Sequence, residues 1–126
     1  MTQREFREEM IKTIYMSIIN PDCDLSNVDQ SLKDTFIDFQ SEVEMIDNLI
    51  ETHLVNWSIQ RLNYVDLAII RYAVFEIVCM DKPKEVVINE ALELTKKYSN
   101  LDDDKARKFN NRLLQNIVDG VSEQHG

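Results

Sequence analysis

Four cations lie close together near the C-terminal end of the chain, around a single phenylalanine. The stretch DDDKARKFNNRLLQNIV holds Lys105, Arg107, Lys108 and Arg112, although the whole chain has a formal net charge of -9. Lysine and arginine neutralise phosphates, an aromatic ring stacks on an unpaired base, and amides read base edges. The stretch is therefore a candidate surface for single-stranded RNA.

Helical geometry groups three of these cations. A helix advances about 100° per residue, which places Lys105, Lys108 and Arg112 within roughly 60° of one another and Phe109 at the border of the apolar face. Arg107 points elsewhere and is a weaker candidate. The alternative is that these cations only solvate an outer helix face and that Phe109 belongs to the core.

Positive charge is concentrated in the second half of the chain. Residues 1–56 hold 4 Lys/Arg against 12 Asp/Glu, whereas residues 57–126 hold 10 against 11. Because an anionic partner is repelled by excess negative charge, we expect it to meet the second half.

The chain lacks the signatures of several functional classes. Cys23 and Cys79 form no CxxC pair and lie far in sequence from His53 and His125, which argues against a zinc site. There is no glycine-rich phosphate loop and no paired nucleophile and base. We expect no catalytic residue, metal or cofactor. Since no signal peptide or membrane-spanning run is present, we expect a cytoplasmic protein.

Apolar periodicity predicts an all-helical chain. The first 119 residues contain no glycine, which tight β-hairpins favour. The segment 64–80 is apolar on every side, as is typical of a helix in the middle of a bundle. Helices are expected over about 6–20, 28–36, 43–57, 64–80, 84–100 and 102–121. The length of 126 residues fits one domain around one core.

A second candidate surface lies on the expected helix at 64–80. One arc of roughly 100° combines two acids with small and apolar side chains. Its members are Asp66, Ile69, Ala73 and Glu76. If the arc is exposed, it is an acid-rimmed apolar strip suited to a basic protein partner. The alternative is that both acids cap or pair inside the bundle, for example with Arg71 or Arg61.

Three segments taken in order resemble the NusB family of bacterial transcription antitermination factors. They are RLNYVDLAIIRYAVFEI, KPKEVVINEALELTKKYS and KFNNRLLQNIV. The resemblance is strong from Arg61 to Val118 and weak before Trp57. The chain differs from the family pattern at Arg112, where the family has glycine, and in the arginine-rich opening segment, of which Arg4 and Arg7 remain.

The resemblance implies an all-helical fold of two small packed helical bundles with about six to seven helices. Within a single domain, the helical subdomains would be about 1–57 and 58–126. It also implies a non-catalytic protein that binds the single-stranded boxA RNA element together with the ribosomal small-subunit protein NusE. The setting would be the RNA polymerase antitermination complex in rRNA transcription, away from any membrane.

The expected RNA-binding set combines the C-terminal stretch with family-matched positions near the N-terminus. It comprises Arg4, Arg7, Tyr15, Lys105, Lys108, Phe109, Asn111 and Arg112. The N-terminal arginines rank second because neighbouring glutamates weaken their attraction for phosphate. An alternative is a NusB-fold protein-protein interaction module with weak or lost RNA binding. Either a monomer or a homodimer is compatible with the sequence.

Overall fold

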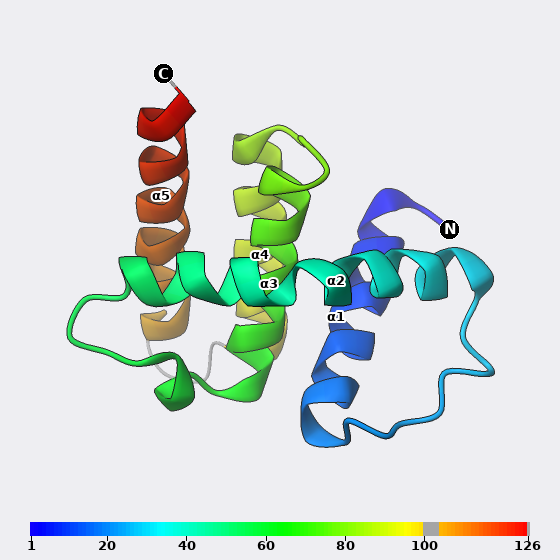
Figure 1. Ribbon diagram of the computed structural model, residues 1–126. Helices are drawn as coiled ribbons and strands as arrows, with labels where there is room; N and C mark the ends of the chain where they lie inside the picture. The colour runs from blue at the N-terminus through cyan, green and yellow to red at the C-terminus, as the bar shows by residue number, and fades with distance from the viewer. Residues whose placement is uncertain (100–103, 126) are drawn as a thin grey trace.

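The computed structural model describes residues 1–99 and 104–125, and within these ranges the chain is entirely helical (Figure 1). No strand occurs there, which confirms the all-α prediction. The elements are α1 (Gln3–Ile19), α2 (Gln30–His53), the short 3-10 helix η1 (Ile59–Arg61), α3 (Tyr64–Val78), α4 (Lys84–Tyr98) and α5 (Lys105–His125).

The central element is α3, which packs against each of the other four α-helices. In Figure 1, α2 crosses in front of α3 and α4, with α5 on one side and α1 on the other. Side chains from Leu67 to Ile70 and from Tyr72 to Glu76 are buried. An apolar helix surface on every side therefore corresponds to the middle of the bundle, as the sequence predicts.

Residues 1–99 and 104–125 form five α-helices, fewer than the six to seven helices expected, because the helices predicted over 28–36 and 43–57 are one helix, α2. No proline or glycine interrupts the chain between them. Phe36, Phe39, Ile46 and Ile50 are all buried, so one apolar stripe continues through the polar stretch around residue 42. The polar residues there face outward without ending the helix.

Side-chain caps fix where two of the site-bearing helices begin. Thr2 and Glu5 form a capping box at the start of α1. Asn63 caps α3, its Oδ1 accepting a hydrogen bond from the Asp66 backbone N–H at 2.8 Å. The last helix was expected to begin at about residue 102, but Asp102 and Asp103 lie outside the described residues, and Asp104 immediately precedes α5.

All five α-helices contribute buried side chains to one connected apolar core. The division into helical subdomains near residue 57 stays a prediction. Among the described residues, no helix has the length and apolar character that crossing a bilayer requires.

Candidate nucleic-acid interface

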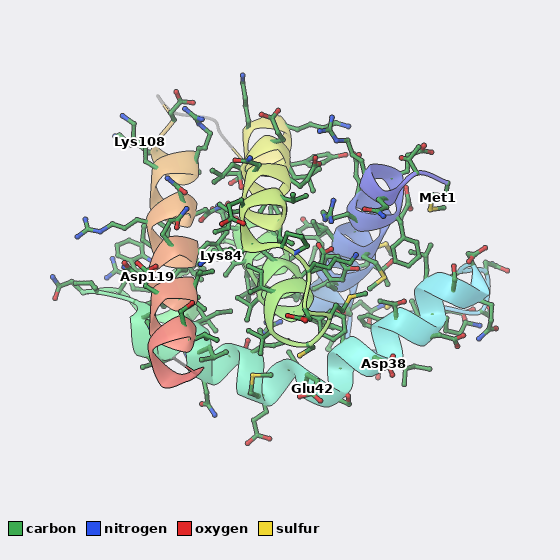
Figure 2. All side chains as sticks on the ribbon, turned by 90° about the horizontal axis from the view of Figure 1, so that it is seen from above. Met1, Asp38, Glu42, Lys84, Lys108 and Asp119 are labelled. Carbon is green, nitrogen blue, oxygen red and sulfur yellow. The ribbon has the colours of Figure 1, made fainter. Side chains whose placement is uncertain are left out.

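The three cations predicted to form a stripe on α5 are exposed, and they make no ion pair with any residue described in the structure. These are Lys105, Lys108 and Arg112. Figure 2 shows Lys108 on the side of the molecule opposite the α2 acids Asp38 and Glu42. The predicted cationic stripe is therefore on the surface, and Lys108 lies away from these two acids.

Several other cationic side chains form ion pairs with acidic residues. Arg107, the weaker candidate of the same stretch, lies 3.7 Å from Asp104. Lys97 pairs with Glu8 at 2.8 Å. Such pairing lowers the local positive potential, so the unpaired cations of α5 are better placed to attract phosphate.

Phe109 lies at the edge of this stripe and is 36% exposed. Its ring contacts Trp57 edge-on, with 6.2 Å between ring centroids and 62° between ring planes. Trp57 is itself 41% exposed, and the guanidinium carbon of Arg61 lies 3.8 Å from its ring centroid. The site thus joins α5 to the connection between α2 and α3, which runs beside the lower part of α5 in Figure 1.

Trp57, which the expected RNA-binding set does not include, lies on the surface beside Phe109. No periodic pattern links the two, because they belong to segments far apart in the chain. The available signal was an aromatic residue in the polar connection VNWSIQ. Asn56, just before it, adopts a left-handed conformation with φ 57°, which asparagine tolerates better than most residues.

A pocket of about 320 Å³ adjoins Phe109 between α5 and the end of α2. Its lining residues are His53, Leu54, Val55, Asn56, Phe109, Arg112, Leu113 and Asn116. The walls therefore combine an aromatic ring, a cation and amides, the groups that contact an unpaired nucleotide. The His53 Nδ1 lies 2.7 Å from the Leu49 carbonyl oxygen, and since a carbonyl oxygen only accepts, this nitrogen donates the hydrogen bond.

Gly120 sits behind this pocket, and its small size lets the His53 ring approach α5. A Cβ at residue 120 would lie 2.4 Å from His53 Nε2. Gly120→Ala is therefore expected to displace the His53 ring. Inside a helix this change usually raises the free energy of unfolding by about 1 kcal/mol, and here the displacement should cancel that increase. Histidine ring NMR signals and urea unfolding would measure both effects.

Ser122→Ala on the same helix is the matched control, because Ser122 is exposed. It should raise the free energy of unfolding slightly through helix propensity and leave the His53 ring signals unchanged. A stabilised Gly120→Ala protein with unmoved histidine signals would contradict the contact between Gly120 and His53.

Arg7, a member of the expected RNA-binding set, is not accessible in the structure. Arg7 is buried, and it donates to Glu76 through Nε at 2.6 Å and Nη2 at 2.8 Å. The hydrogen bond to Glu76 is the main cause that raises the pKa of Arg7, which keeps the guanidinium charged. Arg4 stays accessible, with 65% of its side chain exposed, and it donates to Glu90 at 2.9 Å through both Nε and Nη2.

The acid-rimmed strip expected on α3 is not on the surface. Asp66, Ile69, Ala73 and Glu76 are all buried. Asp66 accepts from Asn63 at 2.8 Å and from Asn110 at 3.0 Å, whereas Glu76 accepts from Arg7. The alternative of acids paired inside the bundle is therefore the observed one, although the partner of Glu76 is neither Arg71 nor Arg61. The strip cannot meet a protein partner in this conformation.

The remaining two expected RNA-binding residues lie on different helices. Asn111 is exposed on α5, on the helix that carries Phe109 and the cationic stripe. Tyr15 is partly buried near the end of α1 and lines a separate pocket of about 320 Å³ with Tyr64 and Tyr98. The structure thus groups Asn111 with the stripe and leaves Tyr15 in another pocket.

A family model and curated relatives match nearly the whole chain, and all of them carry the same name. The model of the NusB family matches residues 3–119. Among curated relatives, the transcription antitermination protein NusB of Bacillus pumilus is 35% identical and covers 98% of this chain and 100% of its own length. That of Pediococcus pentosaceus is 36% identical, covering 94% of this chain and 98% of its own length.

A solved structure of T. maritima NusB has the same arrangement of helices. It superimposes with a TM-score of 0.76 at 28% identity, covering 94% of this chain and 92% of that one. The fold is thus NusB-like and the sequence agrees with it. The chain belongs to the NusB family of transcription antitermination proteins, which confirms the resemblance seen in its motifs and the prediction that it is not an enzyme.

Proposed function

We propose that this protein is an RNA-binding antitermination factor that binds boxA-type single-stranded RNA together with the ribosomal protein NusE. It acts in the bacterial cytoplasm, in the RNA polymerase antitermination complex during rRNA transcription. The observation that carries the proposal is the coincidence of Lys105, Lys108 and Arg112, all free of acidic partners in the described chain, with the exposed ring of Phe109. Cations beside an aromatic ring are the combination that single-stranded RNA requires.

A second candidate function is a NusB-fold interaction module with weak or lost RNA binding. Two observations favour it. Arg7 is withdrawn into a buried pair with Glu76, and Arg4 is bound to Glu90. Neither arginine of the N-terminal segment is then free to contact phosphate without breaking an ion pair.

Titration of a fluorescently labelled boxA-type RNA, with and without NusE, separates the two functions. The RNA-binding function predicts saturable binding that weakens as salt rises. The slope of the logarithm of the binding constant against the logarithm of the salt concentration should be about -0.7 for each phosphate contact with a single strand. It also predicts tighter binding when NusE is present, since linked binding is reciprocal. Binding of NusE with no measurable RNA binding in either condition would support the interaction module instead.

A further inference from the structure

The cluster of Trp57 and Arg61 has no role in the RNA-binding set expected from the sequence. It lies in the connection before α3, and it touches the predicted interface only through the contact between Trp57 and Phe109 at 6.2 Å. Trp57 and Phe109 are both exposed and in contact, with Arg61 over the Trp57 ring, so they form a small aromatic surface beside a cation.

Arg61 is exposed and makes no ion pair with any residue in the described ranges. Its guanidinium contacts the Trp57 ring, whose centroid lies 3.8 Å from the guanidinium carbon. A guanidinium so placed covers one face of the indole, and Trp57 as a whole residue is nevertheless 41% exposed.

We propose that Trp57 is a second base-stacking platform of the RNA site and that Arg61 contacts the adjoining phosphate. An unpaired base stacks on the open part of the indole, and the strand continues past Phe109 toward Arg112. Stacking fits this place because every nucleobase has an aromatic face, so it requires no specific base edge. The proposal rests on the proposed RNA-binding function and extends its interface from α5 to the connection between α2 and α3.

Three features of the chain support an RNA strand as the occupant. Phe109 and Trp57 are neighbouring exposed rings from two separate segments, which suits successive unpaired bases. Arg61, at one side, and Arg112, at the other, are both free of acidic partners in the described chain. The pocket lined by Asn56, Phe109 and Asn116 adds amides beside the rings.

Intrinsic fluorescence tests the stacking directly, because Trp57 is the chain's only tryptophan. Adding a boxA-type single-stranded RNA should quench the emission and protect it from acrylamide. The quench should saturate at the same RNA concentration as binding measured with a labelled copy of that RNA. A structural tryptophan that only packs against Phe109 would show neither change.

Variants then measure how much the indole contributes. Trp57→Leu, which keeps apolar volume without a ring, should weaken RNA binding about 5- to 100-fold, whereas Trp57→Phe should keep most of the affinity. Arg61→Gln should lower the salt slope by about 0.7. The controls are Ile37→Ala, which removes an exposed apolar side chain from α2, and Lys84→Gln at the start of α4. Both should bind as the unchanged protein does.

RNAs with one abasic nucleotide make the test independent of variant stability. In the unchanged protein, one abasic position should weaken binding by a factor similar to that of Trp57→Leu, and in Trp57→Leu the same position should cost almost nothing further. Labelled RNA could bind with salt dependence, leave the tryptophan emission unchanged and bind equally well to Trp57→Leu. That result would overturn the stacking role of Trp57 and leave the proposed function standing. If no RNA binds to the unchanged protein, either alone or with NusE present, the proposed function itself is overturned.

Discussion

Glu76→Ala is expected to lower the free energy of unfolding by about 3 to 5 kcal/mol. Glu76 is 1% exposed, and its carboxylate accepts two hydrogen bonds from Arg7, at 2.6 and 2.8 Å. Lys82 adds a third at 2.9 Å. Without the carboxylate, Arg7 stays buried with Glu90, at 4.0 Å, as its acidic neighbour in the described chain. Urea unfolding followed by circular dichroism measures the loss.

The pair of Arg71 and Asp47 is a natural control, because it has the same two-bond geometry with both distances at 2.8 Å. Its side chains are more exposed, at 18% and 32%. Asp47→Ala should therefore cost about 1 kcal/mol or less. Equal losses for the two variants would contradict burial as the reason for the large effect.

Replacing both Arg7 and Glu76 should lower the free energy of unfolding far less than replacing Glu76 alone. The double variant Arg7→Met with Glu76→Leu removes the uncompensated guanidinium together with the carboxylate, so it should recover most of the lost stability. Lys82 loses its acidic partner in this variant but is partly exposed and can be solvated. A double variant as unstable as Glu76→Ala would mean that the cost comes from packing.

The parts of the fold that sequence could predict are those set by local pattern. Apolar residues on every side of α3 indicated a buried helix, and apolar residues on one face of α1 indicated a helix that packs against the core. Both patterns depend only on spacing within one segment. The exposed position of Lys105, Lys108 and Arg112 followed from the same geometry. Local spacing also misled at α2, where a polar stretch resembled a boundary although nothing ended the helix.

The parts that sequence could not predict depend on contacts between distant segments. The sequence predicts Arg7 as an accessible RNA-binding residue, and it leaves Glu76 open between an exposed strip and an internal pair with Arg71 or Arg61. In the structure Arg7 and Glu76 pair with each other in the core, where each charge neutralises the other. Trp57 and Phe109 likewise belong to unrelated local patterns, and only the turn at Asn56 after α2 brings their rings together. Helical spacing contains no information on such pairs, so both the core ion pair and the aromatic side of the site required the three-dimensional arrangement.

Changing Lys105, Lys108 and Arg112 together to glutamine is expected to produce the largest loss of RNA binding. All three are exposed on one face of α5 and none is neutralised by an acid of the described chain. If each contacts a phosphate, the logarithmic salt slope should fall by about 2, from about 0.7 for each lost contact. Stability should change little, because each exposed substitution costs less than about 0.5 kcal/mol. Titration of boxA-type RNA across several salt concentrations gives affinity and slope together.

The matched control removes the same number of positive charges elsewhere. Lys12 and Lys84 are exposed and Lys33 is partly so, and they lie on α1, α4 and α2. Changing these three to glutamine alters net charge equally, so it should reproduce any loss that comes from the long-range field alone. A much larger loss for the α5 variant assigns the effect to direct contact. If the α5 variant kept both affinity and salt slope, its stripe would only solvate the helix, and RNA binding would have to be sought at Arg4 and Tyr15 on α1.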